Sequence, residues 1–256
     1  MTATATLDVE GVVKTFGGVT AVDGVTLSTA GSDITALIGP NGAGKTTLFN
    51  LVTGFDRPDS GTVSFNGRRL SNVPAWKAAR LGLGRTFQTP VGFPSLCVWD
   101  NLMVAAAQPA SETILGAVMG RIRWGRDLDA CAQRAEEVLD QLGLSDLRDT
   151  HVADLSAGDA KLLEFARQLM RRPRMLLLDE PASGVDPSRL PQLAALIRSL
   201  VAQDIAILLI DHNLSFVLDI ADHIYVMARG RVISEGTPDV VSNDPQVMEV
   251  YMGKAA

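Results

Sequence analysis

The chain contains no apolar run long enough to cross a membrane. Its longest uncharged apolar stretches, residues 175–178 and 205–210, have the length of strands, whereas a membrane-spanning helix needs ~20 residues. The N-terminal sequence MTATATLDVEG has no basic cluster followed by an apolar segment, so we expect no secretory signal. The two cysteines, Cys97 and Cys131, are widely spaced, and we expect them to pack as small hydrophobic residues in a reducing cytoplasm.

An excess of basic residues is absent as well. The chain has 23 Lys and Arg residues against 29 Asp and Glu residues, which gives a formal net charge of −6. Proteins that bind the backbone of DNA or RNA present a broad basic face, so we expect no nucleic-acid partner. With 256 residues, of which 46% are hydrophobic, the chain is long enough for one large domain or two small ones.

Short apolar runs indicate two kinds of β-structure. Near the N-terminus, strand-like runs separated by Gly, Asp and Asn turns predict a small antiparallel layer, and they span residues 7–13, 25–28 and 62–65. Three uninterrupted apolar runs are typical of central parallel strands covered on both faces, and they span residues 34–38, 175–178 and 205–210. Because helical stretches separate these three, the pattern predicts an α/β domain with a mostly parallel sheet.

Strand signals end at about Pro90. From there to Asp154, apolar residues recur at helical spacing, as at Ala135, Val138 and Leu139, which predicts a helical subdomain inserted into the sheet domain. Valines around an Asn-Asp-Pro turn predict helices near the C-terminus. The expected organisation is an α/β core with its antiparallel layer at 1–88 and 160–237, a helical subdomain at 89–159, and a C-terminal helical extension at 238–256.

Residues 39–46 read GPNGAGKT and match the phosphate-binding pattern G-x-x-x-x-G-K-[ST]. Glycines let the backbone turn and direct its N–H groups inward at a helix N-terminus, where the helix dipole favours phosphate. We expect Lys45 to reach the β- and γ-phosphates and Thr46 to ligate Mg²⁺. The alternative is a glycine-rich turn with a chance lysine. The expected binding residues are Asn41, Gly42, Ala43, Gly44, Lys45, Thr46 and Thr47.

Two carboxylates, Asp179 and Glu180, directly follow the apolar run at 175–178. They therefore lie at the carboxyl end of a predicted parallel strand, where ligands bind in open α/β sheets. We expect Asp179 to hold Mg²⁺, directly or through water, and Glu180 to polarise the attacking water. The alternative is a strand that ends in solvated acids.

Two further polar residues lie near the same predicted edge. His212 follows the apolar run at 205–210, which places it beside the proposed site, although a lone histidine is more often structural. Gln88 lies at the junction between the sheet and helical regions, where its amide would sense Mg²⁺ and water. A solvated loop side chain is the alternative for Gln88.

Six motifs occur in the order that is typical of the ATP-binding cassette family, which the chain resembles from about residue 7 to residue 252. The motifs are the phosphate loop, Gln88, the pentapeptide Leu155-Ser-Ala-Gly-Asp159, the run Met175 to Pro181, Ser183-Gly-Val-Asp186 and His212. The resemblance implies a P-loop NTPase (RecA-like) α/β core with a mostly parallel sheet, an N-terminal antiparallel β layer and an inserted helical subdomain. It also implies ATP and Mg²⁺ as cofactors and ATP hydrolysis coupled to transport.

The resemblance implies roles for residues that the phosphate loop alone does not explain. Phe16 would stack on adenine with Val22 nearby, which is the interpretation we favour, and the alternative for Phe16 is a core aromatic. Ser156 and Gly158 would contact the γ-phosphate bound by another cassette, and the alternative for Ser156 is a helix cap. His212 would hold the γ-phosphate and the attacking water. In this family two cassettes clamp two ATP molecules head to tail, and Asp186 would tie the two sites together.

A closer likeness is to cassettes of branched-chain amino acid importers and their relatives for amides and urea. It is carried by the segments 84–89, 93–106 and 111–134 and by the ending from 235 to 253. The implied partners are a second cassette, of the same chain or a paralogue, transmembrane permease subunits and, indirectly, a solute-binding protein. The implied location is peripheral, on the cytoplasmic face of the cell membrane.

Three other functions stay open at this point. A lipid or lipopolysaccharide export cassette has a similar ending but a shorter segment after Gln88. A soluble mechanical cassette that acts on DNA or ribosomes typically has coiled-coil insertions or two cassettes in one chain. A P-loop kinase or small GTPase lacks the 155–159 element and the His212 switch.

The pentapeptide departs from the family pattern at two positions. Ala157 and Asp159 stand where the family most often has Gly and Gln. The negative charge of Asp159 would weaken closure on an ATP γ-phosphate if it faced that group. The interpretation we favour is that Asp159 is an acidic residue of the first helical turn, which the helix dipole stabilises, because Ser156 and Gly158 are intact.

Overall fold

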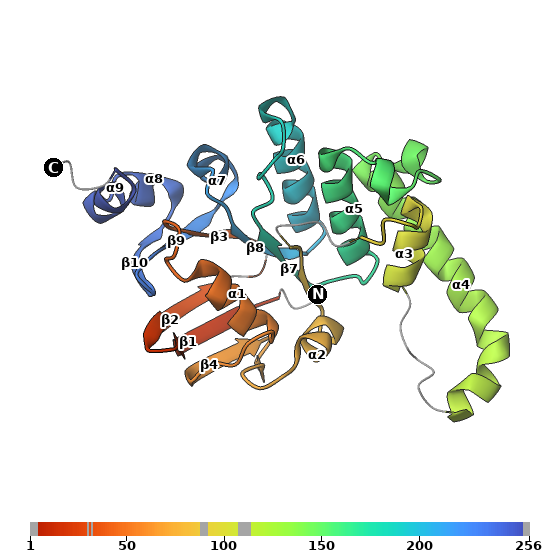
Figure 1. Cartoon of the computed structure of the whole chain (residues 1–256), viewed down its shortest axis with the longest axis horizontal. Coiled ribbons are helices and arrows are strands. Elements are labelled where there is room, and N and C mark those ends of the chain that lie inside the picture. Colours follow the sequence, from red (N-terminus) through yellow and green to blue (C-terminus); the bar gives the residue numbers. More distant parts are fainter. Residues whose placement is uncertain (1–4, 30, 32, 88–91, 107–113, 253–256) are drawn as a thin grey trace. The chain divides into compact units, whose positions relative to one another are not determined.

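A computed structural model describes residues 5–29, 31, 33–87, 92–106 and 114–252 of the chain. The Cα positions divide into two compact units, Met1–Gln88 with Pro173–Ala256, and Thr89–Arg172. The first unit contains both sheets, and the second is helical (Figure 1). None of the described helices is long and apolar enough to span a membrane.

An antiparallel sheet forms the N-terminal part of the first unit, with the strand order β2-β1-β4-β5. Its strands are β1 (Leu7–Phe16), β2 (Val19–Thr29), β4 (Ser60–Phe65) and β5 (Arg68–Arg69). Burial alternates along β1 and β2, as expected for strands with one face on a core and one in solvent. The predicted antiparallel layer is therefore present, and β2 starts earlier than its apolar run.

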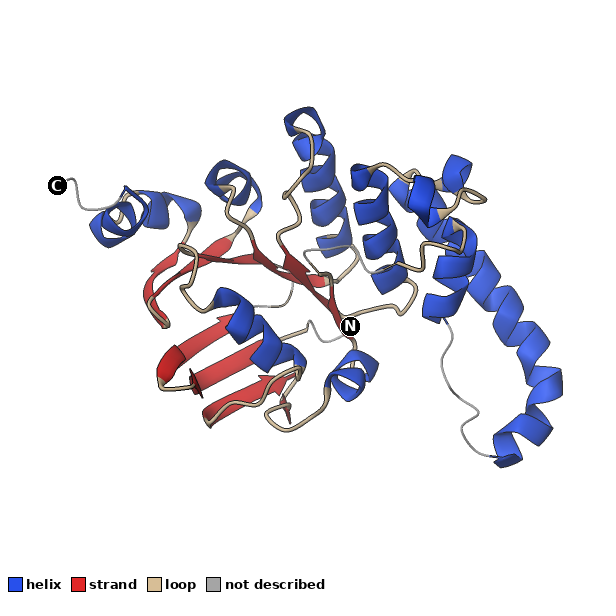
Figure 2. Ribbon diagram, in the orientation of Figure 1, coloured by secondary structure: helices blue, strands red, loops and turns tan. Residues whose placement is uncertain are grey.

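The second sheet of this unit has six strands in the order β10-β9-β3-β8-β7-β6. Figure 2 draws the strands in red and the helices in blue. Its strands are β3 (Ile34–Ile38), β6 (Leu83–Arg85), β7 (Met175–Asp179), β8 (Ala206–Ile210), β9 (His223–Ala228) and β10 (Arg231–Gly236). Only the β9–β10 pair is antiparallel. All residues of β3, β7 and β8 are buried, which explains their uninterrupted apolar sequences. The prediction of a mostly parallel sheet is confirmed.

The core of the first unit lies between its two sheets and includes α1 (Figure 1). From α1 it contains Leu48, Phe49, Leu51 and Val52, all of them at most 1% exposed. The helices of this unit are α1 (Lys45–Thr53), α2 (Ala75–Arg80), η3 (Pro187–Arg189), α6 (Leu190–Val201), α7 (Leu214–Ile220), α8 (Pro238–Ser242) and α9 (Pro245–Met252). A helix enclosed in this way holds its N-terminus in a fixed place.

The second unit is built from helices that pack against one another pairwise. They are α3 (Val98–Ala106), α4 (Ile114–Leu142) and α5 (Ala157–Leu169), together with the short 3-10 helices η1 (Ser145–Leu147) and η2 (Val152–Asp154). Ala135, Val138 and Leu139 of α4 are buried, as their spacing predicts. The fully buried Asn101 bonds the backbone of Phe93 and Cys97, which fixes the segment that leads into α3.

Three features differ from the sequence-based organisation. No predicted run covers the strands β5, β6, β9 and β10. The helical unit extends to Arg172 rather than to residue 159, because α5 packs with α3 and α4. The C-terminal helices belong to the first unit rather than standing apart. Both cysteines are free, as expected.

Phe49→Ala tests the central place of α1. Because the ring is fully buried between the sheets, its removal leaves a cavity, and we expect a loss of about 3–5 kcal/mol in the free energy of unfolding. Urea denaturation followed by circular dichroism measures this value. Phe16→Ala is the matched control, since that ring is 46% exposed and should cost far less. Equal losses in the two variants would contradict the enclosed position of α1.

Candidate nucleotide site

The loop between β3 and α1 has a backbone that only glycine accommodates at two positions. Gly39 has φ 148° and Gly44 has φ 101°, in the region that L side chains rarely adopt. A Cβ atom would lie 2.1 Å from the carbonyl oxygen of Met227 at Gly39 and 2.2 Å from that of Ala21 at Gly44. The loop is therefore packed against neighbouring backbone and holds one shape.

The N-terminus of α1 has no protein group that caps it from a side chain. The cap residue is Gly44, and no acidic residue lies in the first turn. The first N–H groups of an α-helix have no partner within the helix, and together with the helix dipole they form a site for anions. Thr46 of this turn is exposed, whereas Ala43 is buried. The chain thus presents backbone donors at the place where the sequence predicts phosphate.

Lys45 curls back over the same loop. Its Nζ donates hydrogen bonds to the carbonyl oxygens of Gly39 at 2.7 Å and Pro40 at 3.0 Å. Burial lowers the pKa of Lys45, while the nearby charges of Glu180 and Asp179 act in the opposite direction. A partly buried ammonium group that bonds only carbonyl oxygens gains from a phosphate ligand, because anionic acceptors form the stronger hydrogen bonds.

Asp179, the last residue of β7, is 7% exposed. Its backbone N–H donates to the Thr86 hydroxyl at 3.2 Å, and its Oδ2 accepts from Nη2 of Arg85 at 2.9 Å. Among the described residues, no group hydrogen-bonds its other oxygen, Oδ1. The structure thus fixes the carboxylate and leaves one oxygen for another ligand.

Glu180 and His212 come together from the ends of adjacent strands. Nδ1 of His212 lies 3.8 Å from Oε2 of Glu180, because β7 and β8 are paired so that Asp179 faces Ile210. Glu180 has φ 53°, a left-handed conformation that costs energy for a residue with a side chain, and its N–H donates to the carbonyl of Ile210. The His212 side chain is 61% exposed, so it is accessible from solvent.

Asp211 was not among the predicted site residues. It is 1% exposed, and its two oxygens accept the backbone N–H groups of Ala182 and Asn213 at 2.8 and 2.9 Å. It therefore joins the loop after Glu180 to the loop that bears His212. The sequence did contain a signal, since Asp211 directly follows a buried strand.

The two residues expected beside adenine differ in exposure. Phe16 is 46% exposed, with Nζ of Lys14 5.1 Å from its ring centroid. Val22 is fully buried in the core between the sheets, so its side chain offers no surface to a nucleotide. The expectation that Val22 lies beside Phe16 at the base is therefore not met. The alternation of β2, whose inward face carries Val22, explains its position.

In the second unit, Ser156 caps the N-terminus of α5. Its hydroxyl accepts the N–H of Asp159 at 3.2 Å and lies 2.5 Å from the Asp159 carboxylate. The Ser156 hydroxyl thus both accepts from the backbone of Asp159 and donates to its carboxylate, and Asp159 lies in the first turn of α5. Ser156 and Ala157 are exposed and Gly158 is partly exposed, so the start of α5 is open to a ligand.

The remaining expected residues have different positions. Asn41 and Gly42 are exposed at the crest of the phosphate loop, and Thr47 is partly buried. Asp186 caps η3 by accepting the hydroxyl and N–H of Ser188, which lowers the pKa of its carboxyl group. Gln88 lies outside the described residues.

The C-terminal helix α9 carries Tyr251. Burial raises the pKa of its phenol to about 12, and the nearby backbone of Gly39 acts in the opposite direction. No motif marked Tyr251 as a site residue.

Comparison with known proteins identifies the family of this chain. The ABC transporter family model matches residues 22–183, more than half of the chain. The chain belongs to the ATP-binding cassette transporter family. A second model, described as branched-chain amino acid ATP-binding cassette transporter, matches residues 231–256. As a member of this family, the chain is an ATP-binding subunit that hydrolyses ATP to drive transport.

Individual relatives agree with the family. The chain is 36% identical to the high-affinity branched-chain amino acid transport ATP-binding protein BraF of Pseudomonas aeruginosa, over 97% of this chain and 98% of that protein. It is 37% identical to LivG of Escherichia coli K12, a protein of the same description, with the same shares covered. A solved ATP-binding cassette in its ADP conformation has a TM-score of 0.85 at 37% identity, and covers 98% of this chain and 99% of that one.

Lys45→Ala tests the phosphate loop. Loss of the charge-assisted bonds to phosphate should weaken ATP affinity about 10- to 100-fold. Isothermal titration or a fluorescent ATP analogue measures the dissociation constant. Lys77→Ala, on the exposed surface of α2, is the control and should bind as the unaltered protein does. Unchanged affinity in Lys45→Ala would contradict the assignment of the loop.

Proposed function

We propose that this chain is the ATP-hydrolysing subunit of an importer for branched-chain amino acids or related small solutes. Two findings together support the proposal. An intact phosphate loop faces Asp179 and Glu180, and the similarity to branched-chain amino acid cassettes extends over nearly the whole chain, including its ending. A lipid exporter is not favoured, since the matching ending is described for branched-chain amino acid cassettes.

The residues of the first unit hold the nucleotide. The backbone N–H groups from Gly42 to Thr47 surround the phosphates, and Lys45 exchanges its carbonyl partners for β- and γ-phosphate oxygens. Phe16 stacks on the adenine ring, a role that its exposure supports.

Thr46, Asp179 and Gln88 are the residues that would hold Mg²⁺. Mg²⁺ prefers oxygen ligands and commonly takes one or two carboxylates, with phosphates and waters completing its octahedron. A site with one fixed carboxylate and one hydroxyl fits this preference, and the described residues contain no cluster of three His, Cys, Asp or Glu that would hold a metal without phosphate. When bound there, the ion would supply positive charge that neutralises the charge developing on the phosphates during transfer.

Glu180 orients and polarises the water that attacks the γ-phosphorus. Its strained backbone directs the carboxylate at a set angle, and His212, 3.8 Å away, binds the γ-phosphate on the same side. Water adds to phosphorus as the bond to the β-phosphate oxygen breaks, which leaves ADP and inorganic phosphate. Asp211 keeps the two loops in register through its bonds to Ala182 and Asn213.

Two cassettes form the working unit, and the start of α5 in one closes on the ATP of the other. Ser156 and Gly158 then contact the γ-phosphate, and Asp186 contributes at the interface. Because those contacts exist only in the closed state, ATP shifts the equilibrium toward closure and hydrolysis reverses it. The Ser156 hydroxyl must then rotate from the Asp159 carboxylate to the phosphate.

The partners are a second cassette, of this chain or a paralogue, and permease subunits in the membrane. A solute-binding protein acts indirectly, through the permease. The chain sits on the cytoplasmic face of the membrane, held by these subunits. Closure of the cassettes moves the permease, and the choice of solute resides in the partners.

Glu180→Gln separates binding from turnover. We expect ATP affinity within about twofold of the unaltered protein and at least about a 100-fold loss of hydrolysis, because the general base is removed. Light scattering in ATP should detect an accumulated dimer. Glu235→Gln is the control, because Glu235 is exposed on β10. Wild-type turnover in Glu180→Gln would overturn the role of Glu180.

Reconstitution tests the import function. The chain is expressed with the permease subunits of a branched-chain amino acid importer, purified in detergent and placed in liposomes with the solute-binding protein of that importer. We expect the subunits to co-purify and leucine, isoleucine or valine to stimulate ATP hydrolysis. The Lys45→Ala complex is the inactive control. Stimulation by lipid and not by any amino acid would favour an exporter.

A further inference from the structure

Arg85, the last residue of β6, is a buried cation beside the nucleotide site. It is 8% exposed, and its two terminal nitrogens bond three different side chains. Nη2 donates to Oδ2 of Asp179 at 2.9 Å, and Nη1 donates to Oδ1 of Asn50 at 2.7 Å and to the Thr53 hydroxyl at 3.1 Å. One guanidinium thus joins β6, the end of β7 and the helix α1 that follows the phosphate loop.

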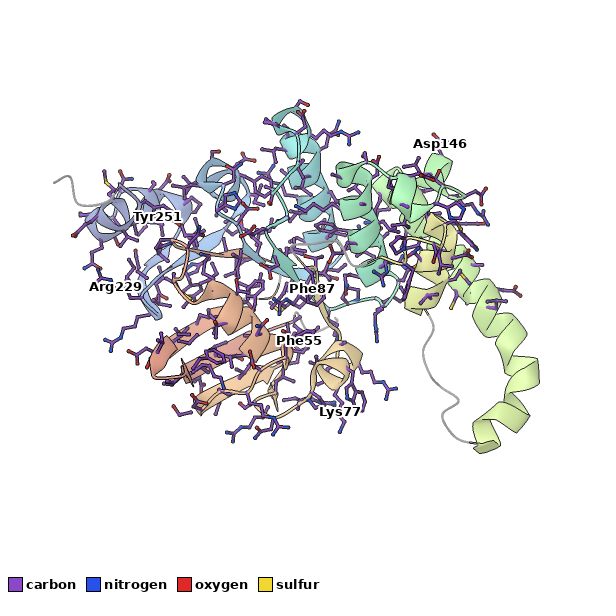
Figure 3. The ribbon with its side chains drawn as sticks, in the orientation of Figure 1. Phe55, Lys77, Phe87, Asp146, Arg229 and Tyr251 are labelled. Carbon is purple, nitrogen blue, oxygen red and sulfur yellow. The ribbon has the colours of Figure 1, made fainter. Side chains whose placement is uncertain are left out.

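Three aromatic rings enclose this guanidinium. Its central carbon lies 5.7 Å from the ring centroid of Phe49, 5.5 Å from that of Phe55 and 5.1 Å from that of Phe87. Phe55 and Phe87 meet edge to face, with centroids 5.7 Å apart. Figure 3 labels both residues. Faces of aromatic rings attract cations, so this cage stabilises the charge and restricts its movement.

Stability alone does not explain why a charged arginine is buried at this position. Transfer of an ion pair from water to a protein interior costs several kcal/mol per ion, and apolar residues of similar volume often replace such a pair without loss. Arginine is suited to hold a carboxylate at a fixed angle, because its planar fork presents several donors in rigid geometry. Here the guanidinium of Arg85 donates hydrogen bonds to side chains of α1 through Nη1 and to the carboxylate of Asp179 through Nη2.

We propose that Arg85 is a positioning residue for Asp179, which directs the free oxygen Oδ1 toward the metal of the bound nucleotide. The inference rests on the proposed role of Asp179 as a metal ligand, and it explains what holds the Asp179 carboxylate in its orientation. Two consecutive residues hydrogen-bond Asp179. The Arg85 side chain donates to its carboxylate, and the Thr86 hydroxyl accepts its backbone N–H. Through Asn50 and Thr53, the same guanidinium ties the carboxylate to α1, which also carries the proposed metal ligand Thr46.

Arg85→Met tests the proposal with Mn²⁺ as the probe. The protein, kept in excess over ADP, is titrated with Mn²⁺, and electron paramagnetic resonance of free Mn²⁺ gives the half-saturating concentration. We expect this concentration to rise at least about tenfold, as for loss of a group that orients a metal ligand. Affinity for a fluorescent ADP analogue in EDTA should stay within about twofold, since the phosphate loop is intact.

Three further variants make the outcome decisive. Arg231→Met removes an exposed arginine from an ion pair with Asp23 and should leave Mn²⁺ affinity unchanged. Arg85→Lys keeps the charge without the fork and should fall between Arg85→Met and the unaltered protein. Asp179→Asn should weaken Mn²⁺ affinity at least as much as Arg85→Met does.

An Mn²⁺ affinity within about twofold of the unaltered protein in Arg85→Met would overturn the proposal and leave Arg85 a structural residue. If Arg85→Met does not fold, an unchanged affinity in Arg85→Lys overturns it in the same way. Unchanged affinity in Asp179→Asn would instead refute the metal site of the proposed function. The two failures are therefore distinguishable.

Discussion

The fixed position of α1 between two sheets is the constraint on which the site depends. Backbone N–H groups form a phosphate site only if the backbone holds them in place, and here the helix that bears them has its apolar side chains buried in the core between the sheets. The loop before it is held as tightly, since the carbonyls of Met227 and Ala21 leave no room for a side chain at Gly39 or Gly44. Rigidity of this kind means that binding requires little ordering of the protein.

Two acids at the end of β7, Asp179 and Glu180, lie close enough to Lys45 for their charges to oppose the lowering of its pKa by burial. The register of β7 and β8 places Asp179 opposite Ile210, which brings Glu180 and His212 within 3.8 Å although 32 positions (212 − 180) separate them in the chain. Two buried polar residues fix these positions. Asp211 hydrogen-bonds the loop that follows Glu180, and Arg85 hydrogen-bonds the carboxylate of Asp179. The start of α5, in the other unit, carries the groups that would complete the site from a neighbouring molecule. Under the proposed function, this division between a unit that holds the nucleotide and a unit that completes a neighbour's site would let ATP act as a switch.

Much of the architecture is predictable because the central strands are buried on both faces. The runs that form β3, β7 and β8 contain almost only apolar residues, and this pattern has few alternatives. β6 has three residues, one of them Arg85, and β10 is a partly exposed edge strand, so neither has such a signal. Val22 and Arg85 illustrate a second limit. Whether a side chain faces a ligand or the core depends on partners distant in sequence, which no local pattern specifies.

The left-handed backbone of Glu180 has a consequence for engineering. Glycine or asparagine would adopt φ 53° more readily, and would relieve about 1–2 kcal/mol of strain. A selection for thermal stability alone would therefore favour replacement of Glu180, the residue to which the proposed function assigns activation of the attacking water. Variants stabilised in that way would retain the fold and the affinity for nucleotide but would lose ATP hydrolysis. Any engineering for stability therefore has to keep glutamate at this position.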